Sequence, residues 1–241
     1  DTGMHRLGFV KGEIDALVEK LRMEPHLEIA SIFTHLSGAE ASEHDGFTEQ
    51  QVTLYTALTD KITKALGINP IRHVLNTGGI LRFPHWQLDM VRLGIGLYGV
   101  YPSVKGRTLL PVAQLKTVVS QVKMVPKGAT IGYGRKGVAE KQSSIATIAI
   151  GYADGYSRQF GQGIGKVLIR GRLAPTIGNV CMDMTMVDVT DIEGVTEGDE
   201  VIIFGPGLPI VDVAQQIGTI PYEILTNTSD RVKRVFHTES L

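Results

Sequence analysis

Apolar residues in the first part of the chain recur at two helical stretches. Over residues 12–23 they fall on one helical face, and Pro25 follows, so an amphipathic helix is predicted to end there. A second helix is predicted to start at Thr48, which with Gln51 is typical of a capping box. Gly67 stands where a glycine would cap its C-terminus.

Between and after these helices, three short apolar runs have the length of buried strands: residues 29–36, 71–75 and 90–97. Helices alternating with buried strands indicate parallel βα units, whose binding groups collect at the C-terminal strand ends. Three strands cannot close an eight-stranded barrel, so we expect the trailing part of a larger TIM-type (β/α)8 barrel. The polar residues at or near these strand ends are His35, Asn76, Thr77 and Arg92.

The pattern changes at residues 102–107, after which short alternating runs are separated by glycine-bearing turns. This pattern predicts a mostly antiparallel β domain, with one short helix over residues 211–217. We therefore expect a barrel part at residues 1–107 and a β domain at 108–241, which is an α/β plus all-β fold. The predicted strands are 117–125, 145–150, 166–169, 182–189 and 200–204.

Composition narrows the class of protein. The 241 residues are 43% hydrophobic and 20% charged, with a net charge of -1, as in a soluble globular protein without an electrostatic reason to bind nucleic acid. No apolar run approaches the roughly 18 residues that span a bilayer. Cys181 is the single cysteine and cannot form an internal disulfide. We therefore expect a cytoplasmic protein with no nucleic-acid or membrane partner.

Two glycine-bounded turns present tyrosines. Tyr133 lies between Gly132 and Gly134, where an unrestricted backbone can push the phenol outward, and Tyr152 and Asp154 follow the run that ends at residue 150. Polar groups gathered at strand ends are where sites usually form. Ordinary hairpin turns with surface tyrosines would give the same pattern.

Other candidates have equally ordinary alternatives. Asn76 and Thr77 before two glycines, with Gly94 nearby, could form a phosphate cup or only a loop. Arg92 in an apolar run is either a paired buried arginine or one that reaches solvent. Taken alone, His35 is a core histidine more often than a catalytic one.

Several chemistries find no support in the sequence. It contains no Ser-His-Asp order, no P-loop and no paired Cys/His metal spacing. Asp183, Asp188 and Asp191 are too openly spaced to indicate a metal, so they are interpreted as strand and turn residues.

Taken together, the segments resemble the successive motifs of the alanine racemases, a family of fold-type III pyridoxal phosphate (PLP) enzymes. The resemblance covers nearly the whole chain and follows the family's order. It rests on Asp1–Gly8, Asn76–Phe83, Asp89–Gly99, Tyr133-Gly134, Ile150–Gly155 and Cys181-Met182-Asp183.

The resemblance implies a TIM-type barrel followed by a β domain, in a head-to-tail homodimer where each β domain completes the partner's site. It implies PLP-dependent interconversion of L- and D-alanine by two-base α-proton transfer, an isomerase reaction that supplies D-alanine as a peptidoglycan precursor. The lysine that forms the aldimine lies on the family's first barrel strand, and no lysine here sits in a matching motif. The chain is therefore expected to be a truncated, inactive piece of the enzyme.

By the same resemblance, Tyr133 matches a catalytic base and His35 the histidine linked to it. Arg92 matches the arginine facing the pyridine nitrogen, and Arg6 the one near the cofactor phenolic oxygen and substrate carboxylate. The phosphate-binding positions match Asn76, Thr77, Gly94 and Ile95. Tyr152 and Arg158 match the substrate entrance, and Met182 and Asp183 match the loop that reaches the partner's site.

The chain departs from the family at two positions. Asp230 stands where many members have a phosphate-bonding tyrosine, and an acid would repel that group unless it points away. His5 replaces a usual glycine. The alternatives are a racemase of serine or another small amino acid, a decarboxylase of the same fold, and a non-catalytic dimerisation or binding module. The decarboxylase is disfavoured because that group is expected to use an acidic residue at the position of Arg92.

Overall fold

The structure is a computed structural model that describes residues 1–101 and 109–237. The chain divides into two compact units, Asp1–Leu110 and Pro111–Leu241, which are described separately below. The predicted boundary near residue 107 lies outside the described residues and stays a prediction.

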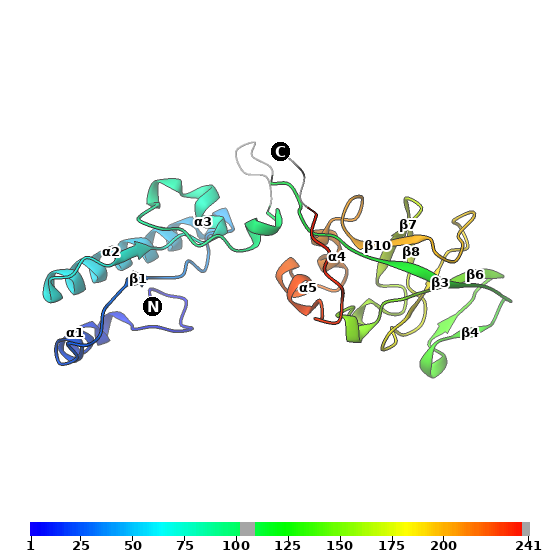
Figure 1. The fold of residues 1–241 in the computed structure, drawn as a ribbon, viewed down its shortest axis with the longest axis horizontal. Coiled ribbons are helices and arrows are strands. Elements are labelled where there is room, and N and C mark those ends of the chain that lie inside the picture. Colours follow the sequence, from blue (N-terminus) through cyan, green and yellow to red (C-terminus); the bar gives the residue numbers. More distant parts are fainter. Residues whose placement is uncertain (102–108, 238–241) are drawn as a thin grey trace. The chain divides into compact units, whose positions relative to one another are not determined.

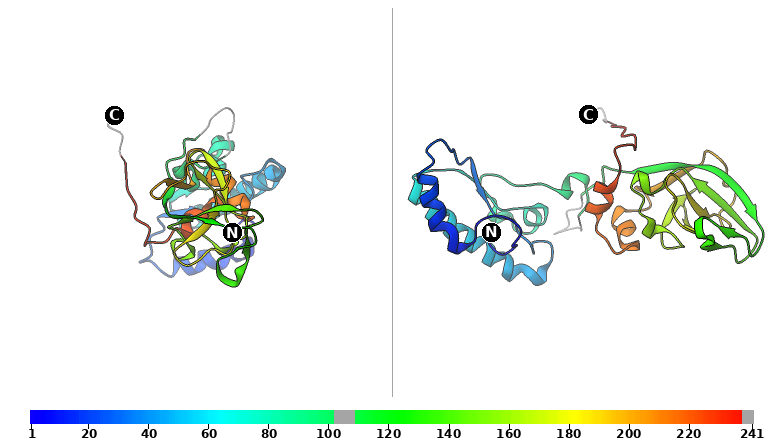
Figure 2. Two further views of the ribbon diagram at one scale, coloured as in Figure 1. Left: turned by 90° about the vertical axis from the view of Figure 1, so that its right-hand side faces the viewer. Right: turned by 90° about the horizontal axis from the view of Figure 1, so that it is seen from below.

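Unit 1 contains two parallel strands and three α-helices (Figures 1 and 2). The strands pair with Ser31 opposite Ile71 and Phe33 opposite His73. This parallel pair confirms the βα pattern for the first two predicted strands, although both are shorter than the apolar runs. The elements are α1 (Ile14–Arg22), β1 (Ser31–Phe33), α2 (Asp45–Leu66), β2 (Ile71–His73) and α3 (Thr77–Arg82).

The third predicted strand, residues 90–97, is wrong. Within the described residues, the N–H of Asp89 donates to the carbonyl of Arg72 in β2, and the N–H of Arg92 donates to the carbonyl of Leu75 just beyond its end. Gly94 then takes a backbone conformation outside the strand region, and a 3-10 turn follows over Ile95–Tyr98. A continuous ladder therefore cannot form, although the segment still lies along β2.

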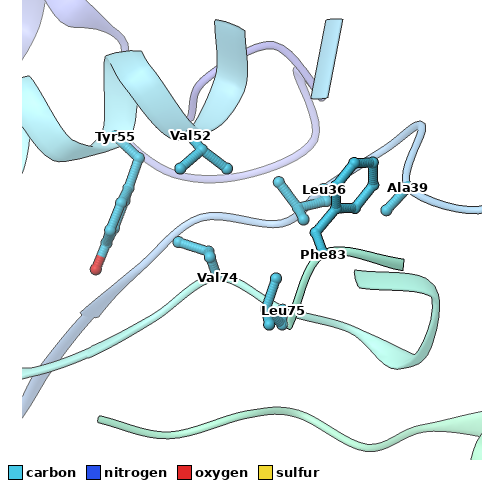
Figure 3. Packing of buried hydrophobic residues seen from close by; sticks show 7 residues of the cluster. All are labelled: Leu36, Ala39, Val52, Tyr55, Val74, Leu75 and Phe83. Atoms are coloured by element: carbon cyan, nitrogen blue, oxygen red, sulfur yellow. The ribbon is translucent and has the colours of Figure 1, made fainter. Parts of the chain in front are cut away.

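The core of unit 1 lies between α2 and the two strands (Figure 3). Tyr55 inserts from α2, and its hydroxyl donates to the carbonyl of Ile32 at 2.8 Å. This hydrogen bond satisfies the one polar atom that the tyrosine brings into the cluster. The cluster consists of Leu36, Ala39, Val52, Tyr55, Val74, Leu75 and Phe83.

The start of α2 differs from the prediction. The helix begins at Asp45, so Thr48 and Gln51 lie inside it and do not form a capping box. Gln51 is instead fully buried, and its amide accepts from the N–H of Ser37 at 3.0 Å and donates to the carbonyl of His35 at 3.1 Å. The predicted C-cap is confirmed, because Gly67 adopts a left-handed conformation and bonds back to Thr63.

Unit 2 is built on a six-stranded antiparallel sheet in the order β8-β7-β10-β3-β6-β9. The long pair of β3 with β6 is visible in Figures 1 and 2. The strands are β3 (Leu115–Val125), β6 (Ser143–Ile148), β7 (Lys166–Ile169), β8 (Arg172–Pro175), β9 (Thr185–Asp188) and β10 (Glu200–Phe204). A small second sheet pairs β4 (Thr130–Ile131) with β5 (Gly137–Val138), and two helices, α4 (Ile210–Gln216) and α5 (Pro221–Asn227), follow.

The sheet of unit 2 nearly closes on itself. Beyond the end of β8, Thr176 forms a bridge to Val187 of β9, and the N–H of Ile177 donates to the carbonyl of Met186 at 2.8 Å. Closure removes the exposed strand edges that an open sheet would present. The predicted antiparallel domain is thus observed, with β7 and β10 at the predicted bounds, while β8, α3 and α5 were not predicted.

The buried amide of Gln51 gives a stability prediction. Gln51→Ala should lower the free energy of unfolding by about 1–3 kcal/mol, because the fully buried amide would lose its hydrogen bonds to the N–H of Ser37 and the carbonyl of His35. Gln50→Ala is the matched control, since Gln50 is exposed on the same helix. Urea unfolding of both variants measures the difference, and equal losses would contradict this role for Gln51.

Candidate active site

Arg92 lies half-buried where the chain leaves β1 and β2. Its Nη2 donates to the carbonyls of Thr34 at 2.9 Å and Val74 at 3.2 Å. Its Nη1 lies 2.7 Å from Nδ1 of His73, and its Nη2 lies 3.3 Å from Nδ1 of His35. One guanidinium therefore ties together the ends of both strands.

All of these partners are uncharged. Among the ion pairs of residues 1–101 and 109–237, none includes Arg92, and its guanidinium lies 4.9 Å from the ring centre of Phe33. Burial lowers the pKa of Arg92 below its ordinary value, but a guanidinium stays charged at any physiological pH. The site thus holds a positive charge without a carboxylate to compensate it.

The two histidines beside Arg92 are held in one tautomer. A guanidinium can only donate, so Nδ1 of His35 and of His73 must accept and the ring proton lies on Nε2. Burial, and then the charge of Arg92, lowers the pKa of both histidines, with Arg6 contributing at His35. Both rings are therefore neutral near pH 7.

His73 was missed by the sequence reasoning, although it is the last residue of β2. It is buried, stacks on Phe33 with ring centres 5.1 Å apart, and its Nε2 has no hydrogen-bond partner within the described part of the chain. Its place at the end of an apolar strand was a signal that could have identified it. The structure adds it to the predicted pair His35 and Arg92.

The predicted phosphate-binding residues meet beside these strand ends. Thr77 opens α3, which corrects the expectation of a loop, and its buried hydroxyl accepts from the N–H groups of Gly94 at 3.0 Å and Gly96 at 3.3 Å. Asn76 caps α3 by accepting from Gly79 and donates to the carbonyl of Leu36. Ile95, between the two glycines, is buried. The side chains of Asn76 and Thr77 are thus bonded to backbone groups of neighbouring segments and hold the two loops together.

Arg6 is exposed and lines a cavity of about 420 Å³ in unit 1 together with Thr34, His35 and Phe33. The structure therefore brings Arg6 to the same side of unit 1 as His35. The remaining lining is largely apolar and comes from α1, α2, the segment that precedes α1, and the region of β1.

In unit 2, the turn around Tyr133 has the predicted character. Gly132 and Gly134 both have positive φ, and the phenol is 75% exposed. The turn is held from behind by Asn179, whose amide donates to the carbonyl of Tyr133 at 3.0 Å. The two glycines therefore aim the phenol away from the body of unit 2.

The second turn rests on the same segment. The N–H groups of Tyr152 and Ala153 donate to the carbonyls of Cys181 and Met182, both at 3.0 Å. Tyr152, Met182 and Asp183 are exposed and thus brought together, whereas Arg158 is exposed one turn further along the chain. Residues 179–183 therefore brace both tyrosine turns, a role that the sequence alone did not indicate.

The described residues offer neither a cluster of metal-binding side chains nor a membrane-spanning helix. Within residues 1–101 and 109–237, no group of three or more His, Cys, Asp or Glu side chains could hold a metal ion. The same residues include no helix with the length and hydropathy needed to cross a bilayer.

The neutral histidines give a pH prediction. His35 and His73 should titrate below pH 6.5, and unit 1 should lose stability as the pH falls below about 6.5, because the unfolded chain then binds more protons. Arg92→Met should raise both pKa values, whereas Arg92→Lys should raise them less because it keeps the charge. Imidazole NMR titrations measure this, and unchanged values in Arg92→Met would contradict the arrangement.

Both units match known family models. Residues 1–102 match the model described as alanine racemase, N-terminal domain, and residues 112–236 match alanine racemase, C-terminal domain. An alanine racemase of Clostridium tetani is 41% identical over 98% of this chain and 63% of its own length. This chain thus spans a little under two thirds of the length of such relatives.

Solved structures agree. An alanine racemase of Bartonella henselae with covalently bound pyridoxal phosphate is 34% identical, with a TM-score of 0.84 over 98% of this chain and 64% of its own. One from a D-cycloserine-producing Streptomyces lavendulae is 31% identical, with a TM-score of 0.89 over 100% and 65%. These matches confirm the expected fold class, a part of the barrel followed by a mostly antiparallel β domain. The chain therefore belongs to the alanine racemase family.

Proposed function

We propose that the protein to which this chain belongs interconverts L- and D-alanine with PLP as its cofactor. The observation that supports this most is the family match over both units, in the family's order. The relative from Bartonella henselae holds pyridoxal phosphate covalently, which supports the same cofactor for this family member.

The residues of unit 1 fit PLP. Arg92 carries a positive charge, and its partners among the described residues are neutral. Its guanidinium can therefore donate a hydrogen bond to the lone pair of a pyridine nitrogen. A donor that does not release its proton leaves that nitrogen unprotonated. His35 and His73, fixed as neutral acceptors toward Arg92, keep the guanidinium in place. PLP would supply the electron sink that stabilises negative charge when the α-proton of alanine is removed.

The phosphate group would be held beside the same strand ends, where Thr77 opens α3. We assign it to Asn76, Thr77, Gly94 and Ile95, because backbone N–H groups at glycine-containing turns bind anions well. Thr77 fixes the distance between the two loops through Gly94 and Gly96. Asp230 is fully exposed in unit 2 and lies 3.5 Å from Arg234, so a cation partly compensates its charge.

Tyr133 would remove or return the α-proton on one face of alanine. Phenols are ordinarily protonated at neutral pH, so a phenol that acts as a base needs cationic or hydrogen-bonding neighbours. We assign this role to His35 and Arg92 of a partner subunit, within a head-to-tail homodimer. Arg6, Met182, Asp183 and Tyr152 would meet the alanine or line its path, and Arg158 would stand at the entrance.

The proposed function is tested with a protein that contains this chain and the remaining third of the family's length. With added PLP it should convert L-alanine to D-alanine and the reverse, with a final ratio near one. Chiral chromatography measures both directions, and serine is the comparison substrate. Absence of conversion of alanine in a PLP-loaded dimer would overturn the proposal, and faster conversion of serine would overturn its substrate.

Tyr133 gives a prediction with enantiomer selectivity. In the complete dimer, Tyr133→Phe should suppress exchange of the α-proton with solvent by about 100-fold or more for one alanine enantiomer, because one acid-base group serves one face. The resemblance implies that L-alanine is the one affected. Exchange in D₂O followed by NMR measures this, with Tyr222→Phe as the control on another exposed tyrosine.

The same variant tests action across the dimer. Heterodimers of Tyr133→Phe with a subunit whose cofactor lysine is replaced would hold one intact site if Tyr133 serves the partner. Activity should then recover toward that of one site per dimer. No recovery in verified heterodimers would place both residues in one subunit's site.

A further inference from the structure

Three segments of unit 2 meet at the turn that holds Tyr152. The turn is bonded to the second segment through the carbonyls of Cys181 and Met182. The third segment follows α5, and its Ser229 donates from the backbone to the carbonyl of Asp154 at 3.1 Å. The segment after α5 therefore contacts the Tyr152 turn, and this turn is bonded to the Met182–Asp183 loop.

Arg231 joins these segments through its side chain. Its Nε lies 2.9 Å from Oδ1 of Asp154, and its Nη2 donates to Oδ1 of Asp183 at 2.6 Å. The other carboxylate oxygen of Asp154 accepts from the N–H of Gly151 at 2.8 Å. One planar guanidinium thus spans two carboxylates on two different loops, which a lysine ammonium cannot match with the same geometry.

The backbones at this junction are packed as closely as glycine allows. A Cβ on Gly151 would lie 2.3 Å from the carbonyl oxygens of Cys181 and Met182, and one on Gly155 would lie 2.1 Å from that of Asn227. Because the backbones of these segments are in direct contact, the position of one segment constrains the positions of the others. A change at Arg231 is therefore felt at Met182.

The Arg231–Asp183 ion pair adds little to folding. The side chains of Arg231 and Asp183 are each about half exposed, and solvent screens pairs of this kind. Hydrogen bonding to Asp183 raises the pKa of Arg231 above its ordinary value, so its guanidinium stays charged at every physiological pH. Its effect is on where the loop lies, not on whether unit 2 folds.

We propose that Arg231 is a positioning residue that locks the Met182–Asp183 loop onto the Tyr152–Asp154 turn and so sets the face that unit 2 offers to the substrate carboxylate. The second clause rests on the proposed function. The first does not, because it concerns contacts within unit 2 alone.

Hydrogen exchange tests the lock without any activity. In the full chain, Arg231→Met should speed amide exchange at Tyr152 and Ala153 by about tenfold, because their acceptors lie on the freed loop. Amides of β6 and β10 should keep their rates. The matched control is Arg234→Met, which removes a neighbouring arginine that pairs with the fully exposed Asp230 and donates to the carbonyl of Thr228 but contacts neither loop carboxylate.

Kinetics in the complete PLP-loaded dimer test the consequence. Arg231→Met should raise KM for alanine about threefold or more while kcat stays within about twofold, since ground-state binding of the carboxylate is disturbed and the proton-transfer groups are not. Arg231→Lys should restore part of the loss, and Asp183→Asn should reproduce it from the other side of the pair. The thermal midpoint should fall by no more than in Arg234→Met.

The outcomes separate the two proposals. Unchanged exchange at Tyr152 and Ala153 in both Arg231→Met and Asp183→Asn would overturn the lock, whatever the activity. Faster exchange with an unchanged KM would overturn its role toward the substrate. Loss of kcat equal to the rise in KM would also overturn it, and an unsubstituted protein without racemisation would defeat the proposed function while leaving the exchange result standing.

Discussion

The guanidinium of Arg92 lies at the ends of two parallel strands, and its partners among the described residues are all neutral: three backbone carbonyls, two imidazole nitrogens and an aromatic ring. Hydrogen bonds from a charged donor contribute about 1.5–3 kcal/mol each, which offsets the cost of drawing a cation partly out of water. The same bonds fix the tautomers of both histidines. Because no carboxylate in residues 1–101 or 109–237 pairs with Arg92, its charge remains available to a ligand.

This arrangement explains why the segment after Leu88 need not be a strand. Arg92 reaches back across β2 and β1, so its side chain supplies the connection that a ladder of backbone bonds would otherwise make. The glycines that follow free the chain to turn toward Thr77, whose hydroxyl closes the second loop. The charge of Arg92 and this glycine-containing turn thus lie on one short stretch of chain.

Unit 2 uses a different constraint. The side-chain amide of Asn179 holds the Tyr133 turn, and backbone bonds to Cys181 and Met182 hold the Tyr152 turn, where Gly151 leaves room for the close approach. These turns extend from the nearly closed sheet, and Arg231 bridges Asp154 and Asp183 on two of its loops. Polar groups that are distant along the chain come to lie side by side because the sheet curves and brings its loops together.

The sequence alone predicted the elements whose local pattern was strong. The apolar periods of α1 and α2, the Gly67 cap, the strands β7 and β10 and the outward-facing Tyr133 follow from side-chain spacing and glycine chemistry, which act over a few residues. Motif order also indicated the family. The predicted roles of the individual site residues stay predictions.

Tertiary structure decided the rest. Thr48 and Gln51 match the sequence pattern of a capping box, yet both lie inside α2. The amide of Gln51 instead bonds to backbone groups of a segment fourteen or more residues away. His73, the bridge of Arg231 and the course of residues 90–97 likewise depend on partners distant in the chain. Local spacing fixes periodicity, but which polar groups meet is fixed only when the strands and loops pack.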